Sequence, residues 1–231
     1  GGGEGVLVTA VHLAPEVPSA DSTEVSIFID GVQVPGTLSY GETTGRVRIE
    51  AGTYDVGIGL PGADGPLLEL MDVELNDGDD ITIVAYRTNE DLPVDVFVFS
   101  NSTDGLAADT GRVFVAHGAN DPALDPVNIA TSNEAGDADC TTLIGNFQFE
   151  DTFPPQGEPN LDVPASTLNV GFDVAGDECP DVGPVPVPVT DGVVSILVAV
   201  DEDTSNEPDA LDPELWGIVD ADTLVRLIKT E

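Results

Sequence analysis

The stretch with the clearest metal-binding spacing is an acidic run at residues 201–212. Oxygen-bearing side chains stand at positions 1, 3, 5, 7, 9 and 12 of a calcium-loop pattern, namely Asp201, Asp203, Ser205, Glu207, Asp209 and Asp212. Asn206 replaces the glycine that the sharp turn of such a loop needs, and no helix is predicted on either side. Because this spacing arises readily in so acidic a chain, we favour a solvated loop between strands, and calcium is the one cofactor that the sequence would fit.

The two histidines of the chain, His12 and His117, are each followed by a turn, which in the first case contains Pro15. A zinc or catalytic site gathers several unlike ligands, whereas these two histidines occupy equivalent places in an internal repeat described below. We therefore predict that each imidazole is buried or half-buried and ties the end of a strand to the following turn. The alternative is a metal or ligand contact.

The two cysteines, Cys140 and Cys179, both lie in the second half of the chain, in acidic loop-like surroundings. Two ligands do not make a zinc site. An even pair in an exported protein usually bridges, and closing a loop of this length stabilises a fold by about 4 kcal/mol in the chain-entropy model. We predict a disulfide between them.

Two further residues carry weaker signals. Asn101 begins an Asn-Ser-Thr glycosylation sequon in a predicted surface linker, which matters only in a host that glycosylates exported proteins. Trp216, the one tryptophan, lies in a strand-like run and is expected to anchor a core or a domain contact rather than to stack on a sugar. No motif brings unlike titratable groups together as a catalytic set, so we expect no enzyme.

The charge of the chain restricts its partners. It has 44 Asp and Glu against 6 Lys and Arg, a formal net charge of −38. Nucleic acids and anionic membrane surfaces need clustered basic residues, so neither is an expected partner. Such a surface is typical of proteins in strong brine, where salt screens the repulsion, although acidity that serves solubility alone is the simpler alternative.

The apolar content is nevertheless sufficient for a packed core. Hydrophobic residues make up 41% of the chain, and the mean hydropathy is +0.06. Apolar and polar residues alternate in runs at 25–29, 54–58, 81–85 and 94–98, each bounded by Gly, Pro, Asp or Asn. No apolar run reaches the roughly 18 residues of a membrane span. The sequence predicts an all-β protein built from antiparallel β-sandwiches.

Comparison of the chain with itself indicates two copies of one domain. Residues 8–16 match 113–121, residues 51–57 match 165–171, and the segment from Asp77 to Ala85 matches that from Asp191 to Ala199. The expected organisation is a flexible tether at 1–5, a first sandwich at 6–102, a linker at 103–111, and a second sandwich with long loops at 112–231. The glycine-rich tether is of the kind that follows a removed export signal, and a lipid anchor there is compatible with it.

The segments 11–18, 24–31 and 51–56 carry a resemblance. They are similar to a pattern of the form V-H-x-S-P-D-A-P-x-V-D-V-x-V-D-G followed by A-G-T-Y. This pattern marks a tandem domain of unknown function (DUF4397-like) in exported bacterial and archaeal proteins. The second copy departs from it, with Asn120 in place of the motif proline, and residues 19–23 resemble an insertion. The resemblance implies an Ig-like or transthyretin-like sandwich at the cell surface, with no known reaction.

These observations lead to an expectation about function. We expect a non-catalytic extracellular or cell-surface structural protein, a subunit of a self-assembling layer or filament whose partners are other copies of itself or surface components. The N-terminal strand, residues 5–10, is the candidate for completing a neighbour's sheet. The alternative is a ligand-binding or adhesion module that recognises a glycan with the help of calcium.

Overall fold

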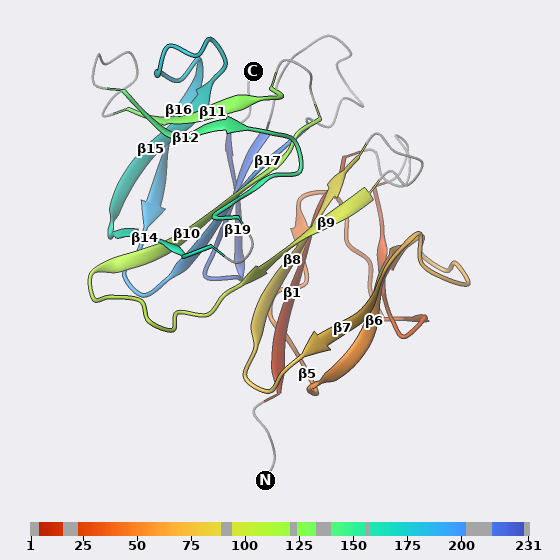
Figure 1. Ribbon diagram of the computed structural model, residues 1–231. Coiled ribbons are helices and arrows are strands. Elements are labelled where there is room, and N and C mark those ends of the chain that lie inside the picture. Colours follow the sequence, from red (N-terminus) through yellow and green to blue (C-terminus); the bar gives the residue numbers. More distant parts are fainter. Residues whose placement is uncertain are drawn as a thin grey trace. The chain divides into compact units, whose positions relative to one another are not determined.

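The computed structural model describes residues 5–15, 23–88, 94–120, 124–132, 140–155, 158–201 and 214–228. Within these ranges all regular structure is β-strand, which confirms the predicted all-β class (Figure 1). None of the described segments is a helix that could cross a membrane. The chain divides into two compact units, of which unit 1 takes in the described residues up to Ser102 and unit 2 those from Thr103 onward.

Unit 1 contains two sheets. Its strands are β1 (Val6–Leu13), β2 (Ser26–Ile29), β3 (Val32–Gln33), β4 (Glu42–Thr43), β5 (Val47–Ile49), β6 (Gly52–Gly59), β7 (Leu68–Leu75), β8 (Asp80–Arg87) and β9 (Val94–Ser100). One sheet has the order β4-β1-β8-β9, with β5 also paired to β1, and the other has the order β3-β2-β6-β7. Figure 1 shows β6 and β7 lying opposite β1, β8 and β9.

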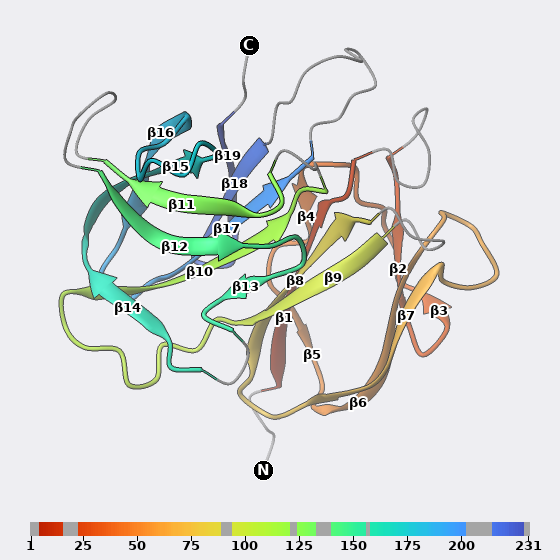
Figure 2. The same ribbon diagram turned by 45° about the horizontal axis from the view of Figure 1, so that its top comes forward.

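Unit 2 repeats this arrangement and adds one strand. Its strands are β10 (Thr110–Gly118), β11 (Val127–Thr131), β12 (Thr141–Phe147), β13 (Thr152–Phe153), β14 (Leu161–Pro164), β15 (Ser166–Asp173), β16 (Val182–Val189), β17 (Val194–Val200), β18 (Glu214–Val219) and β19 (Thr223–Ile228). One sheet has the order β13-β10-β17-β18-β19, with β14 on β10, and the other has the order β12-β11-β15-β16. Figure 2 shows β11 and β12 lying over β10 and β17.

The registers of the two units correspond residue by residue at the central strands. His12 of β1 lies opposite Ala85 of β8, and His117 of β10 lies opposite Ala199 of β17. The three matched sequence blocks therefore fall on corresponding strands, β1 with β10, β6 with β15, and β8 with β17. Positions in the two units can be compared directly on this basis.

The central pairings differ from the expected antiparallel pattern. β1 pairs with β8 in parallel, and β10 pairs with β17 in parallel, while the other pairings are antiparallel. A parallel pair needs a long crossover between its strands, and here the intervening chain builds the opposite sheet before it returns. Side-chain alternation has the same period in both kinds of pair, so the sequence pattern does not distinguish them.

The prediction of a free N-terminal strand at residues 5–10 is wrong for the folded chain. β1 pairs on one side with β8 and on the other with β4 and β5. Even Gly5, just before the strand, donates its N–H to the Asp77 carboxylate at 2.6 Å. Both edges of β1 are therefore occupied within its own sheet.

In each unit the core lies between the two sheets. In unit 1 the buried cluster includes Val25 next to β2, Ala85 of β8 and Val94 of β9. In unit 2 the cluster is larger and includes aromatic side chains from one sheet, Phe147 and Phe172, packed with residues such as Leu197 of the other. Burial of apolar surface between facing sheets is what stabilises such a pair of layers.

Candidate functional site

His12 is buried at the end of β1, with 1% of its surface exposed. Its Nε2 lies 2.8 Å from the carbonyl oxygen of Thr23, and its Nδ1 accepts the N–H of Ala14 at 3.4 Å. Pro15, two residues beyond β1, is also buried. The imidazole thus connects the strand end to the turn after it and to the segment that leads into β2.

His117 occupies the same place in unit 2. It is also 1% exposed, and its Nε2 lies 2.7 Å from the carbonyl oxygen of Leu124. Its Nδ1 is buried and has no hydrogen-bond partner among the described residues. Burial lowers the pKa of His117 below 6.5, although the Leu124 carbonyl and the carboxylates of Asp125 and Asp151 act in the opposite direction. A neutral ring that donates from Nε2 fits this geometry.

Because the pKa of His117 is lowered on folding, we expect a pH effect on stability. Above pH 6.5 the imidazole is neutral in both states; as the pH falls below 6.5, the unfolded chain binds a proton that the folded ring does not. The free energy of unfolding should then fall by up to about 1.4 kcal/mol per pH unit. Urea unfolding of wild type and His117→Gln in molar salt, from pH 7.5 down to 5.5, measures this. Parallel pH profiles for the two proteins would contradict the expectation.

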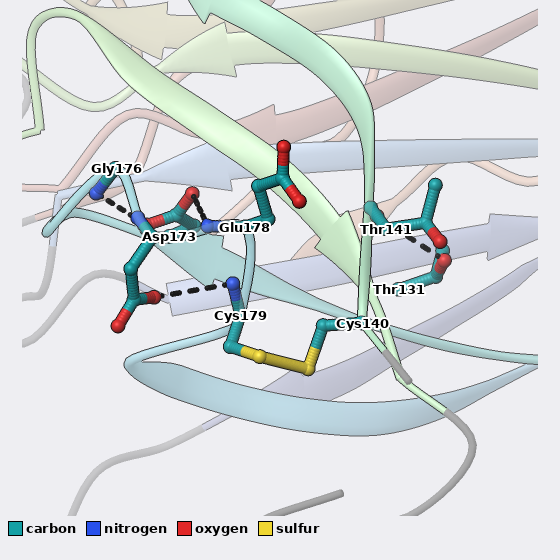
Figure 3. Close-up of a disulfide and its surroundings, with 8 residues drawn as sticks. Thr131, Cys140, Thr141, Asp173, Gly176, Glu178 and Cys179 are labelled. Carbon is teal, nitrogen blue, oxygen red and sulfur yellow. Dashed lines mark hydrogen bonds between the residues drawn. A yellow bond between two sulfur atoms is a disulfide. The ribbon is translucent and has the colours of Figure 1, made fainter. Parts of the chain in front are cut away.

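The predicted disulfide is present. Cys140 and Cys179 are joined, with Cα atoms 5.0 Å apart. Cys140 lies directly before β12, and Cys179 lies in the connection between β15 and β16 (Figure 3). The bond therefore links the start of β12 to the β15–β16 connection of the same sheet, in which β11 lies between β12 and β15.

The connection that carries Cys179 is organised by Asp173, a residue that the sequence reasoning missed. The Asp173 carboxylate is 1% exposed and accepts backbone N–H groups from Gly176 at 2.6 Å and Glu178 at 3.0 Å (Figure 3). It also accepts the side-chain amide of Asn128 at 3.1 Å. Desolvation raises the pKa of Asp173, but these hydrogen bonds together outweigh it, so the pKa is lowered from 3.8. Asp173 is therefore held as a carboxylate that fixes the loop.

Most of the calcium-like run lies outside the described residues. This applies to Asp203, Ser205, Glu207, Asp209 and Asp212. Asp201 is described, and its Oδ1 accepts the N–H of Asn120 at 2.9 Å, which connects the end of β17 to the turn after β10. Among the described residues there is no group of three or more His, Cys, Asp or Glu side chains placed to hold a metal ion.

Asn101 is not on an exposed linker as its sequon suggested. It is 7% exposed, and its Nδ2 donates to the Asp80 carboxylate at 2.8 Å and to the Thr82 hydroxyl at 2.9 Å. Its backbone N–H donates to the Asp80 carbonyl at 2.8 Å. Glycosylation would attach a sugar to this same nitrogen and replace one of its two N–H donors, so at least one of these side-chain bonds would be lost. The arrangement is that of a structural amide that closes the end of β9 onto β8.

Trp216 lies in β18 within a buried polar cluster. Its indole N–H donates to the Glu214 carboxylate at 2.9 Å, and the Arg226 guanidinium lies 5.7 Å from its ring centre. Arg226 of β19 also forms an ion pair with Glu214, which is 1% exposed. Sequence reasoning singled out the tryptophan but missed Glu214. A structural anchor within the sheet fits these contacts.

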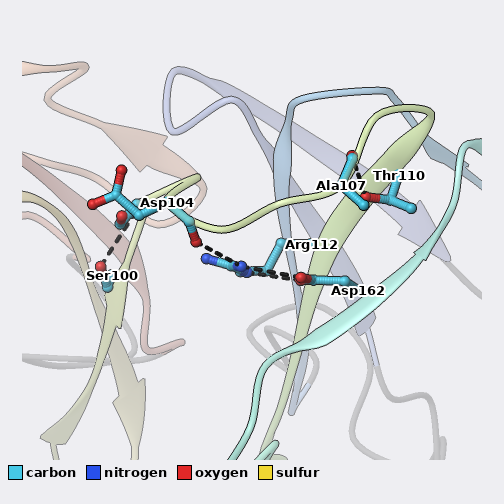
Figure 4. A network of polar contacts seen from close by, with 7 residues as sticks. Ser100, Asp104, Ala107, Thr110, Arg112 and Asp162 are labelled. Atoms are coloured by element: carbon cyan, nitrogen blue, oxygen red, sulfur yellow. Dashed lines mark hydrogen bonds and ion pairs between the residues drawn. The ribbon is translucent and has the colours of Figure 1, made fainter.

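The segment at 103–111, expected to be a linker, is bonded to unit 2. Arg112, at the start of β10, forms a bidentate ion pair with Asp162 of β14, at 2.8 and 3.1 Å (Figure 4). The same guanidinium donates to the Asp104 carbonyl at 3.3 Å, and the N–H of Ala165 donates to the Asp109 carbonyl at 2.8 Å. With 4% of its surface exposed, Arg112 fastens this segment to the edge of the β10 sheet.

The two units differ at one sheet edge. In unit 2, β16 carries proline at alternate positions, and Pro186 and Pro188 lie opposite Asn169 and Thr167 of β15. Since proline has no N–H, these are non-hydrogen-bonded pairs, and the edge of β16 that faces away from β15 lacks donors there. In unit 1 the corresponding edge strand is β7. Glu74 of β7 lies opposite Thr53, and in unit 2 the equivalent pair is Pro188 with Thr167. β7 carries no proline; a register shift interrupts its pairing with β6 between Tyr54 and Val56, where the N–H of Asp72 donates to the Asp55 carboxylate at 2.9 Å.

A comparison with known protein families finds a match over the first half of the chain. A family described as "Domain of unknown function (DUF4397)" matches residues 6–127, which span all described strands of unit 1, β10 and the first residue of β11. No curated protein matches the sequence. The match covers more than half of the chain, so the chain belongs to the DUF4397 family of domains of unknown function.

Proposed function

We propose that this chain is a non-catalytic structural protein that acts outside the cell and assembles with other copies of itself. In this proposal each unit is a β-sandwich of the Ig-like or transthyretin-like kind. The shared core between paired sheets supports the sandwich assignment. The disulfide is compatible with an oxidising, extracellular compartment, and the net charge of −38 suits a surface that works in salt.

The observation that carries the self-assembly proposal is the difference between the edges of β7 and β16. An edge strand with free donors and acceptors can pair with another strand, and alternating prolines prevent this at β16. The β7 edge has no proline, and Met71 on it is 61% exposed. We infer that unit 1 offers the edge through which copies associate, while unit 2 is protected there.

The charges on β7 set the conditions for this association. Glu69 and Glu74 are exposed on this strand, so two copies that approach by this edge repel each other in dilute buffer. At molar salt the Debye length is about 3 Å, and the repulsion is screened. Association through β7 should therefore strengthen as salt is raised, in contrast to association through opposite charges.

A proline at the counterpart of Pro188 tests this proposal. In Glu74→Pro the new residue takes a place where unit 2 already accommodates proline, and it removes the N–H donor. Glu74→Ala, which removes the same charge but keeps the donor, is the matched control. In sedimentation velocity at molar salt we expect wild type and Glu74→Ala to self-associate, and Glu74→Pro to do so at least tenfold more weakly.

Two results would contradict the proposal. Wild-type protein that remains monomeric from low to molar salt, with and without calcium, would exclude self-assembly by any edge. Equal association of wild type and Glu74→Pro would exclude β7. A response to calcium and to a soluble glycan without self-association would instead favour the adhesion alternative.

A further inference from the structure

Unit 1 contains an apolar cavity between its two sheets. The cavity has a volume of about 130 Å³. One wall is formed by inward side chains of β1, β5 and β8, and the other by those of β2, β6 and β7. Ala10, Ile58 and Ile83 are representative of this lining, which is almost entirely aliphatic.

The few polar groups of the lining are already engaged. His12 is bonded at Nε2 to Thr23 and at Nδ1 to Ala14. The Thr44 hydroxyl accepts the N–H of Ala10 at 2.9 Å and donates to the Gly45 carbonyl at 2.8 Å. A buried water needs two to four polar partners, so water gains little in this space. The cavity is suited to an apolar guest instead.

Unit 2 carries larger side chains at three positions that correspond to the cavity lining of unit 1. Ala10 pairs with Thr44 in unit 1, and the corresponding pair in unit 2 is Val115 with Phe153. Phe172 is the counterpart of Ile58 in unit 2. Ile58 lies opposite Ile27, and Phe172 lies opposite Ile129.

Several lining positions change in the other direction, including Val11, Ile49 and Leu75, which correspond to Ala116, Val163 and Val189. Ile29 corresponds to Thr131, and Ile81 corresponds to Ser195. Phe172 belongs to the buried core of unit 2, and Phe153 packs against it. Unit 1 thus lacks the two aromatic rings that unit 2 places at the positions of Phe153 and Phe172.

The cavity borders a second hollow that reaches exposed residues. This second hollow, of about 300 Å³, shares Val34, Leu38 and Thr44 with the cavity lining. Its other wall includes Pro35, Gly36 and Thr37, which are exposed. A ligand could therefore enter between the segment after β3 and the segment that carries β4 and β5.

We propose that unit 1 binds an uncharged apolar small molecule, of the size of a benzene ring or a short alkyl group, in this cavity. A comparable apolar cavity of about 150 Å³ in another protein stays dry and binds benzene or xenon. Aliphatic walls and the absence of an unengaged polar partner select against charged or strongly polar ligands. This site is distinct from the β7 edge of the proposed assembly and does not depend on it.

Benzene is the probe that tests this site on the full chain in molar salt. We expect a saturable rise in unfolding temperature with benzene and saturation-transfer NMR signals from it. Ile58→Phe places in the cavity the side chain that unit 2 has there, and it should weaken benzene binding at least tenfold. Ala10→Val adds two methyl groups to the lining, which is more volume than Ile58→Phe adds, and it should weaken benzene binding at least as strongly. Val98→Phe, at a position 53% exposed and outside the lining, is the control that should bind as wild type does.

Each outcome decides for or against the site. Loss of benzene binding in both Ala10→Val and Ile58→Phe, with retention in Val98→Phe, supports it. The proposal is overturned if wild type shows no saturable binding, or if binding survives both filling substitutions in proteins whose circular dichroism is unchanged. Because Ala10→Val fills the cavity independently and unit 2 carries Val115 at the corresponding position, a failure of Ile58→Phe to fold leaves the test intact.

Discussion

Replacing both cysteines, as in Cys140→Ser/Cys179→Ser, is expected to lower the free energy of unfolding of unit 2 by about 4 kcal/mol. The bond closes a loop with a sequence separation of 39 residues, and its loss enlarges the conformational freedom of the unfolded chain. The folded loop keeps the hydrogen bonds of Asp173, so the native state should change little. The expected loss therefore arises mainly in the unfolded state.

The single tryptophan provides the measurement. Trp216 lies in unit 2, so its fluorescence during urea unfolding reports on that unit alone. Wild type with reductant should approach the double variant, and reductant should have no effect on the variant itself. A double variant that unfolds at the same urea concentration as oxidised wild type would show that the disulfide contributes no stability.

Arg226→Met is expected to lower the free energy of unfolding of unit 2 by about 3 kcal/mol, at the lower end of the range for breaking a buried ion pair. The substitution removes a positive charge beside the Glu214 carboxylate, which is 1% exposed, and also removes the cation above the Trp216 ring. Arg226 itself is about one third exposed, and this partial exposure is why the lower end of the range applies.

A second substitution separates charge from packing. Glu214→Gln added to Arg226→Met should recover part of the lost stability, because a neutral amide is buried at less cost than a carboxylate and can still accept from the indole N–H. Equilibrium urea unfolding followed by Trp216 fluorescence measures both variants. The expectation is wrong if the free energy of unfolding of Arg226→Met lies within about 0.5 kcal/mol of the wild-type value, because the ion pair would then contribute little to stability.

Much of the fold was predictable from local patterns in the sequence. The alternating runs at 54–58, 81–85 and 94–98 all fall within strands, β6, β8 and β9, because alternation directly encodes a half-buried strand. The disulfide followed from an even cysteine count. The parallel pairing of β1 with β8 did not follow, since pairing direction depends on where a strand docks and not on its own sequence.

The buried polar residues were the least predictable part of the candidate sites. Asp173 and Glu214 are two acids among 44 Asp and Glu, and nothing local marks them as buried. Asn101 matched a surface motif but is bonded to Asp80 and Thr82 by the register of β8 with β9. One difference at the cavity is visible in the sequence. When the two copies are aligned by strand register, Ala10 of unit 1 corresponds to the larger Val115 of unit 2. That comparison needs the strand register, which the structure supplies.

β1 pairs in parallel with β8, and β10 pairs in parallel with β17. These pairings determine how early each unit can fold during synthesis. Gly5 is bonded to Asp77, 72 residues away, and Asn120 is bonded to Asp201, 81 residues away. Contacts so distant along the chain give a high contact order, and all-β proteins of this kind fold in milliseconds to seconds. Neither unit can complete its central sheet until nearly all of it has left the ribosome. Late folding of this kind would keep the chain unfolded during passage through a protein-conducting channel, which the extracellular role proposed above would require.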